Sequence, residues 1–152
     1  MDPEIVSSRR LDAPRAAVFS AFSDPEVLAK WWGPEGFTNS FEVFDFRPGG
    51  EWRFTMRDPD GGIYPMSKSF VEIVPRERIV VQHLEPPHHR FLMTILFADE
   101  AGGTRITWRM LFELPEEAER VREIVQQANE QNLDRLAAQL AQQPTGQLPP
   151  LA

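Results

Sequence analysis

The sequence predicts an α+β fold, in which helices cover one face of an antiparallel sheet. Three observations predict it. A strand-like segment near the start precedes two short helical segments, residues 37–112 show the two-residue alternation of strands, and a 3.6-residue apolar period returns only after residue 115. Because the strands follow one another through short turns, we expect a single antiparallel sheet with the helices segregated on one face.

The N-terminal segment predicts one strand and two helices. Residues 5–11 contain β-branched residues and form the strand. Pro14 is tolerated at the start of a helix, and the alanines and phenylalanines that follow it supply an apolar helical face. Asp24 can cap a second helix, residues 26–31, by accepting hydrogen bonds from unpaired amide groups. Residues 32–36 cannot continue this helix and are predicted to form a loop.

Turn signals divide the middle of the chain into six further strands, which brings the total to seven. They cover residues 41–47, 51–57, 63–74, 78–84, 90–98 and 104–112. The clearest alternation lies in the second of these segments, where Trp52, Phe54 and Met56 share one face. The turn that follows it, residues 58–62, contains two glycines that allow positive φ.

A long amphipathic helix is predicted after Pro115. Its apolar residues recur at steps mostly of three or four: Ala118, Val121, Val125, Ala128, Leu133, Leu136 and Leu140. About 27 residues at 1.5 Å each would span roughly 40 Å, so the helix must lie across the sheet.

The length of 152 residues allows one domain, which we place at residues 1–143. Residues 144–152 contain three prolines and one glycine and are expected to form a flexible tail. The net charge of −7 argues against nucleic acid as a partner. No run approaches the roughly 20 apolar residues of a membrane span, and the start of the chain does not look like a secretory signal. We therefore expect a cytoplasmic protein, and the lack of cysteine fits a reducing compartment.

A curved sheet and a straight helix diverge, so we expect a cavity between them, beneath the two short helices. Large and adaptable side chains on the predicted inner face would line it and bind an apolar ligand. The predicted lining residues are Trp32, Trp52, Phe54, Met56, Met66, Met93, Phe97, Trp108, Met110 and Leu133. The alternative is that the same side chains form an ordinary packed core.

One amide, Asn129, falls on the apolar stripe of the long helix, and Asn132 borders that stripe. A buried amide without a partner costs about 1–3 kcal/mol, so Asn129 should bond to the sheet, to water or to a ligand. In a ligand-binding protein it is the first candidate for orienting the polar end of the ligand.

Two neighbouring tryptophans, Trp31 and Trp32, end the second short helix. Adjacent side chains point in different directions, so one is expected to pack inward while the other meets solvent or a partner. The tryptophans could serve as core packing for the two short helices, or the inward one could cover the mouth of the cavity, because binding residues concentrate on loops.

The three histidines give little support for a metal site or a catalytic acid or base. His88 and His89 are adjacent in a proline-rich turn, which does not match the spacing of a zinc pair, and we expect no metal and no cofactor. His83 is a weak candidate for a general acid or base, since an unperturbed histidine titrates near pH 6.5. Glu72 and Glu85 are its candidate carboxylate partners. A surface histidine, or one with its bonds satisfied in a strand, is the alternative.

Five groups of residues between Val6 and Leu140 form a specific combination. They are Ala13-Pro14 with Val18-Phe19, Asp24-Pro25 with Trp31 to Pro34, Asp45 to Phe54, Gly103-Thr104 with Ile106-Thr107, and Leu133, Leu136, Ala137 and Leu140. With these residues the chain resembles the SRPBCC or START-like helix-grip proteins, and among them the polyketide cyclase-like bacterial homologues of the heat-shock-protein-90 ATPase activator. The resemblance implies a seven-stranded sheet around the last helix, a cavity that accepts apolar small molecules in many relatives, and no shared catalytic residues.

The chain departs from these relatives at two places. Many of them have a Gly-Trp pair in the last helix, where this chain has Asn129 and Glu130. Many also have a glycine before an aromatic residue, where this chain has Ser69 and Phe70. The floor of the cavity is therefore expected to be particular to this protein.

Three functional hypotheses follow from the residues and the resemblance. The leading one is a cytoplasmic protein that binds a hydrophobic or amphipathic, lipid-like small molecule without chemistry of its own. The second is a cyclase, dehydratase or hydrolase that uses His83 with help from Asn129. The third is stimulation of a chaperone ATPase, which only the family's name suggests and which would need an exposed Trp31 or Trp32. A homodimer is compatible with each of them.

Overall fold

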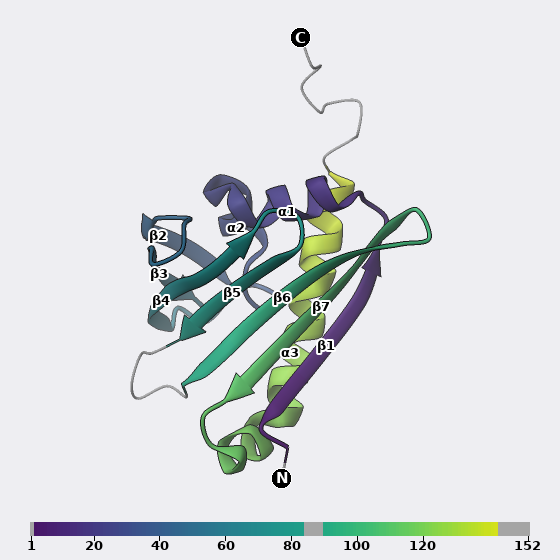
Figure 1. The fold of residues 1–152 in the computed structure, drawn as a ribbon. Coiled ribbons are helices and arrows are strands. Elements are labelled where there is room, and N and C mark those ends of the chain that lie inside the picture. Colours follow the sequence, from purple (N-terminus) through teal and green to yellow (C-terminus); the bar gives the residue numbers. More distant parts are fainter. Residues whose placement is uncertain (1, 84–89, 143–152) are drawn as a thin grey trace.

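The computed structural model describes residues 2–83 and 90–142 and has the α+β fold that the sequence predicts (Figure 1). The elements are β1 (Glu4–Leu11), α1 (Arg15–Ser23), α2 (Pro25–Trp31), β2 (Thr38–Phe44), β3 (Glu51–Arg57), β4 (Ile63–Val74), β5 (Arg78–His83), β6 (Phe91–Glu100), β7 (Gly103–Phe112) and α3 (Pro115–Ala141). The seven strands form one antiparallel sheet in the order β1-β7-β6-β5-β4-β3-β2. The predicted tail, residues 144–152, lies outside the described residues.

The boundary of β2 differs from the sequence-based expectation. We predicted a strand over residues 41–47, but β2 begins at Thr38 and ends at Phe44. After Phe44 the chain turns, because the Asp45 amide donates to the Glu51 carbonyl (2.9 Å) and the Gly50 amide donates to the Arg47 carbonyl (2.8 Å). Gly50 is required in this turn, since a Cβ there would lie only 1.9 Å from the Asp45 carbonyl oxygen.

The helices lie on the concave face of the sheet, here called the inner face. α3 runs closest to β1, with β7, α1 and α2 as its other backbone neighbours, while β2, β3 and β4 extend away from it (Figure 1). The apolar core lies between these layers, and the opposite face of the sheet carries mostly exposed or half-buried side chains. The described helices lack the apolar length that would be needed to cross a membrane.

A proline explains how α1 and α2 meet. Pro25 has no amide hydrogen, so the carbonyl of Ala21 cannot receive the usual helical bond from the residue four positions later. The indole of Trp31 donates to that carbonyl instead (3.0 Å). Asp24 caps α2 as predicted, with its carboxylate accepting from the Glu26 amide (3.0 Å).

Arg135 of α3 fastens the loop that follows α2. Its guanidinium donates to five backbone carbonyls, at distances of 2.9–3.2 Å, in the segment from Lys30 to Phe37. Gly33 in this loop has a φ of +99°, and a Cβ there would lie 2.6 Å from the end of the Met56 side chain. The Glu35 amide also donates to the side chain of Gln131 of α3 (3.2 Å), so two α3 side chains hold the loop, which fits closely over β3.

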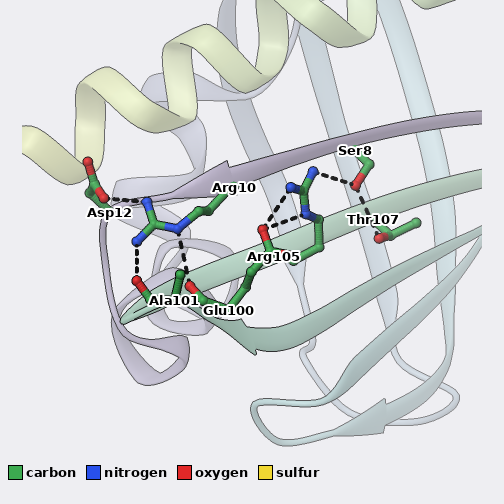
Figure 2. A network of polar contacts seen from close by, with 7 residues as sticks. All are labelled: Ser8, Arg10, Asp12, Glu100, Ala101, Arg105 and Thr107. Carbon is green, nitrogen blue, oxygen red and sulfur yellow. Dashed lines mark hydrogen bonds and ion pairs between the residues drawn. The ribbon is translucent and has the colours of Figure 1, made fainter.

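A second polar network joins the end of β1 to the β6–β7 hairpin (Figure 2). Arg10 donates to the carbonyls of Glu100 (3.1 Å) and Ala101 (2.7 Å), and it also pairs with Asp12. Arg105 pairs with the Glu100 carboxylate (2.7 Å) and donates to the Ser8 hydroxyl. These bonds hold a tight turn in which Ala101 has a φ of +47°.

Candidate functional site

The predicted lining residues come from six parts of the fold. Trp52, Phe54 and Met56 lie on β3, Met66 on β4, Met93 and Phe97 on β6, Trp108 and Met110 on β7, Leu133 on α3, and Trp32 just after α2. All are buried except Met66, which is half-buried. The strand alternation therefore identified inner-face positions, and their role in ligand binding stays a prediction.

Trp32 is the centre of an aromatic cluster under α2. Its ring centroid lies 4.9 Å from that of Trp52 and 5.3 Å from that of Trp108, on which it stacks. Trp31 packs edge-on against Phe22 of α1, and Phe22 also contacts Phe97. The region beneath the two short helices, where we predicted the cavity, is thus occupied by these rings.

The expectation that one of the neighbouring tryptophans meets solvent is wrong. Trp31 is 1% exposed and Trp32 is 5% exposed. Trp31 turns toward α1 because its indole N–H supplies the bond that Ala21 lacks. Trp32 has left the helix and has an extended backbone, which directs its ring onto β3 and β7.

Two indoles of the inner face keep an unpaired N–H. The Nε1 atoms of Trp52 and Trp108 are buried and have no hydrogen-bond partner in the described part of the chain, and the same holds for the side-chain oxygen of Asn39. Most buried polar groups in folded proteins are paired, so such groups need an explanation. An acceptor from a bound molecule would be one partner for the two N–H donors.

Asn129 lies inside the protein, as its place on the apolar stripe predicts. It is 7% exposed, and its amide donates to the Ser7 hydroxyl of β1 (3.2 Å) and lies 3.5 Å from the Met110 sulfur. The bond to the sheet, one of the partners considered for this amide, is therefore present. Asn132 is also buried and donates to the Trp31 carbonyl (3.1 Å).

A buried lysine, Lys68, is the inner-face residue that the sequence-based reasoning missed. Directly opposite residues on neighbouring strands form one row across this face: Trp52, Lys68, His83, Phe91 and Phe112. Lys68 is 4% exposed and His83 is 1% exposed. The Lys68 Nζ lies 3.2 Å from His83 Nδ1 and 5.1 Å from the centre of the Phe91 ring.

No carboxylate among residues 2–83 and 90–142 forms an ion pair with Lys68. Burial lowers the pKa of its ammonium group from 10.5 to about 7, because the charged form loses its hydration. An ammonium only donates, so in the charged form the contact requires a neutral Nδ1 on His83. The pair can hold an anion by charge-assisted hydrogen bonds, or pass a proton from one side chain to the other.

A signal for Lys68 is present in the sequence. It lies between Met66 and Phe70 at alternating positions, and the short turn at residues 58–62 brings it opposite Trp52. We overlooked it because a lysine in a strand usually marks the exposed face.

The two candidate carboxylate partners of His83 are not shown to pair with it. Glu72 is bound to Arg78 (2.6 Å), and Glu85 lies outside the described residues. His88 and His89 also lie outside them, so their arrangement is not tested. Within the described ranges, no three histidine, aspartate or glutamate side chains gather as metal ligands would.

A family model described as "Activator of Hsp90 ATPase homolog 1-like protein" matches residues 12–141. The chain belongs to this family. The match covers most of the chain and confirms the resemblance to the SRPBCC proteins. The fold of this family commonly binds hydrophobic ligands.

Solved structures support the same assignment. A protein from Nitrosomonas europaea is 25% identical with a TM-score of 0.84, over 92% of this chain and 95% of that one. A protein from Chromobacterium violaceum is 29% identical with a TM-score of 0.79, over 89% and 95%. One from Rhizobium leguminosarum is 29% identical with a TM-score of 0.68, over 91% and 94%. A search of curated proteins found no match.

Proposed function

We propose that this member of the family binds a hydrophobic or amphipathic small molecule between the inner face of its sheet and α3, without chemistry of its own. The observation that carries the proposal is the pair of buried, unpaired indole N–H groups on Trp52 and Trp108. Leaving such a group without a partner costs about 1–3 kcal/mol. A ligand with an acceptor atom would remove this cost and bury its own apolar surface at about 25 cal/mol per Å².

The side chains around these indoles support the proposal. Met56, Met66, Met93 and Met110 extend from four strands onto the same face. Methionine has three rotatable bonds and adapts to irregular shapes, so it can rearrange around a guest. Because aromatic rings fill the region beneath α1 and α2, the proposal places the ligand beside them, along the row that contains Lys68.

Native mass spectrometry of protein purified from its own host tests the proposal. A retained small molecule, released on denaturation, is the expected result. Thermal denaturation with a panel of lipids, aromatic compounds and polyketide-like compounds should show a rise in Tm with at least one class. A protein that retains nothing and whose Tm no compound raises would overturn the proposal.

A matched pair of variants locates the binding. Trp52→Phe removes an unpaired N–H, whereas Trp31→Phe removes one that is already bound to Ala21. We expect Trp52→Phe to weaken ligand binding severalfold and Trp31→Phe to leave it nearly unchanged. Equal effects of both variants would mean that the ligand does not use this indole.

A catalytic role is the second hypothesis, and one observation favours it. His83, the predicted base, lies on the inner face in contact with an amine whose pKa is about 7. Incubation of the recovered ligand with fresh protein, followed by mass spectrometry, separates the two roles. An unchanged ligand supports binding alone, and a new product that His83→Gln fails to form supports an enzyme.

The hypothesis that the protein stimulates a chaperone ATPase required an exposed tryptophan as a contact site. Trp31 and Trp32 are both buried, so this support is lost. The proposal retains a cytoplasmic protein, acting as one chain or as a homodimer, with residues 1–143 as the binding domain. Sedimentation with and without the ligand would determine the oligomeric state.

A further inference from the structure

Lys68 is an unusual residue to find in the middle of the inner face. It lies on β4, an internal strand, with Trp52 opposite it on β3 and His83 opposite it on β5. An ammonium group is seldom fully buried unless it is paired with a carboxylate. Its described contacts are instead a histidine and an aromatic ring.

Among the described side chains at this point, hydrogen-bond donors outnumber acceptors. The ammonium carries three N–H donors, and the His83 Nδ1 contact uses one of them. The unpaired indole N–H belongs to Trp52, the residue directly opposite Lys68. A cluster of donors in an apolar setting is suited to a group that only accepts and that carries negative charge.

We propose that Lys68 and His83 bind the acidic head of the ligand, so that the natural ligand is an apolar molecule that ends in a carboxylate. This inference rests on the proposed function and specifies its ligand class. The carboxylate would accept from the Lys68 ammonium, and the apolar part would extend over the methionines of β6 and β7, Met93 and Met110. Binding would restore the charge that burial of Lys68 disfavours.

A comparison of decanoate with 1-decanol tests the inference, because the two probes share an apolar chain and differ in the head. We expect decanoate to bind the wild-type protein at least tenfold more tightly at pH 7, measured by calorimetry or tryptophan fluorescence. Acetate at the same concentrations should have no effect, since it lacks the chain.

Variants of the two lysines provide the matched control. The chain has only two lysines, and Lys30 lies on the surface at the end of α2. In Lys68→Met, decanoate and 1-decanol should bind with about equal affinity. Lys30→Met should leave the preference unchanged.

The same two lysines permit a direct measurement on the wild-type protein. With lysine labelled at ¹³Cε, NMR should show two signals, one that titrates near pH 7 and one near the ordinary lysine value. Saturation with decanoate should move the titration of Lys68 upward by one pH unit or more, while that of Lys30 stays in place. This measurement needs no variant, so it applies even where Lys68→Met fails to fold.

The outcomes separate the two proposals. Equal binding of decanoate and 1-decanol, unaffected by Lys68→Met and without a shift in the Lys68 titration, would overturn the acidic head and leave apolar binding intact. Binding of 1-decanol alone would do the same. If neither probe binds and the wider panel fails as well, both proposals are wrong.

Discussion

The β6–β7 hairpin and the centre of the inner face differ in how their positively charged side chains are paired. At the hairpin, Arg10 and Arg105 are partly exposed, and their guanidinium groups are matched by carbonyls and by carboxylates (Figure 2). On the inner face, Lys68 is buried, and no described carboxylate pairs with it. The polar groups of the hairpin network are paired with one another, whereas the described part of the inner face has hydrogen-bond donors without acceptors.

This difference suggests how structural and functional polar groups can be told apart in this fold. A network whose donors and acceptors balance contributes to stability and needs nothing further. A buried group without its counter-charge lowers stability, and proteins often retain such groups where they serve a function. The following four predictions test the contrast.

Replacement of Lys68 should have the largest effect. The pKa of about 7 in the folded protein lies below the ordinary value of 10.5, so between these values the unfolded chain binds more protons and the folded protein gains stability as the pH rises. The Lys68→Met variant lacks this dependence. We expect it to exceed the wild type in free energy of unfolding most strongly below pH 7, with the difference shrinking by up to about 5 kcal/mol toward pH 10.5.

Urea denaturation at pH 6 to 10 measures this effect, with Lys30→Met as the control. Lys30 is exposed, so its replacement should leave the pH dependence unchanged. A difference between Lys68→Met and wild type that stays constant with pH would show that Lys68 remains charged, which would remove the contrast with the hairpin.

Tryptophans with and without a partner should respond differently to loss of the indole N–H. Trp31→Phe leaves the buried Ala21 carbonyl unpaired, while Trp52→Phe removes a donor that has no partner. We expect Trp31→Phe to be more destabilising than Trp52→Phe by about 2 kcal/mol in chemical denaturation. The reverse order would mean that the N–H of Trp52 is satisfied in solution.

At the hairpin, Arg10→Met should lower the free energy of unfolding by about 1 kcal/mol. The variant loses the bonds to the Glu100 and Ala101 carbonyls but buries no unpaired charge. Denaturation at pH 6 and pH 9 should give the same loss, in contrast to Lys68→Met. A loss that varies between these two pH values would contradict the assignment of a purely structural role.

The smallest effect is expected at the turn itself. Ala101 has a φ of +47°, a region that is costly for residues with a Cβ. Ala101→Gly should therefore stabilise the protein by about 0.5 kcal/mol after the greater flexibility of glycine in the unfolded chain is counted. Thermal denaturation should show a small rise in Tm, and a fall would mean that Arg10 already removes the strain.

Most of the fold could be predicted because its patterns are local. Alternation identified β3 with its observed bounds, and the 3.6-residue period after residue 115 identified α3. The end of β2 was placed three residues too late, because the bond from Asp45 to Glu51 that ends it joins residues on two sides of a turn.

The site was less predictable because it depends on contacts between distant segments. Asn129 could be placed inside from its position on one helix. The burial of Trp32 depends on Trp52 and Trp108. The role inferred for Lys68 depends on its contact with His83 and on the absence of an ion pair between Lys68 and a described carboxylate. Periodicity gives the face on which a residue lies, but it does not say whether a buried charge has a counter-charge.

The hydrogen bonds from Arg135 to the loop after α2 would influence the residence time of a bound ligand. A molecule that departs past Trp32 must separate one guanidinium from five carbonyls together. Escape by this route would have a high barrier and a steep temperature dependence, and an Arg135→Met variant should shorten the residence time more than it weakens the affinity. In such a protein, the loop after α2 would determine how slowly the ligand dissociates, and the inner face of the sheet would determine how tightly it binds.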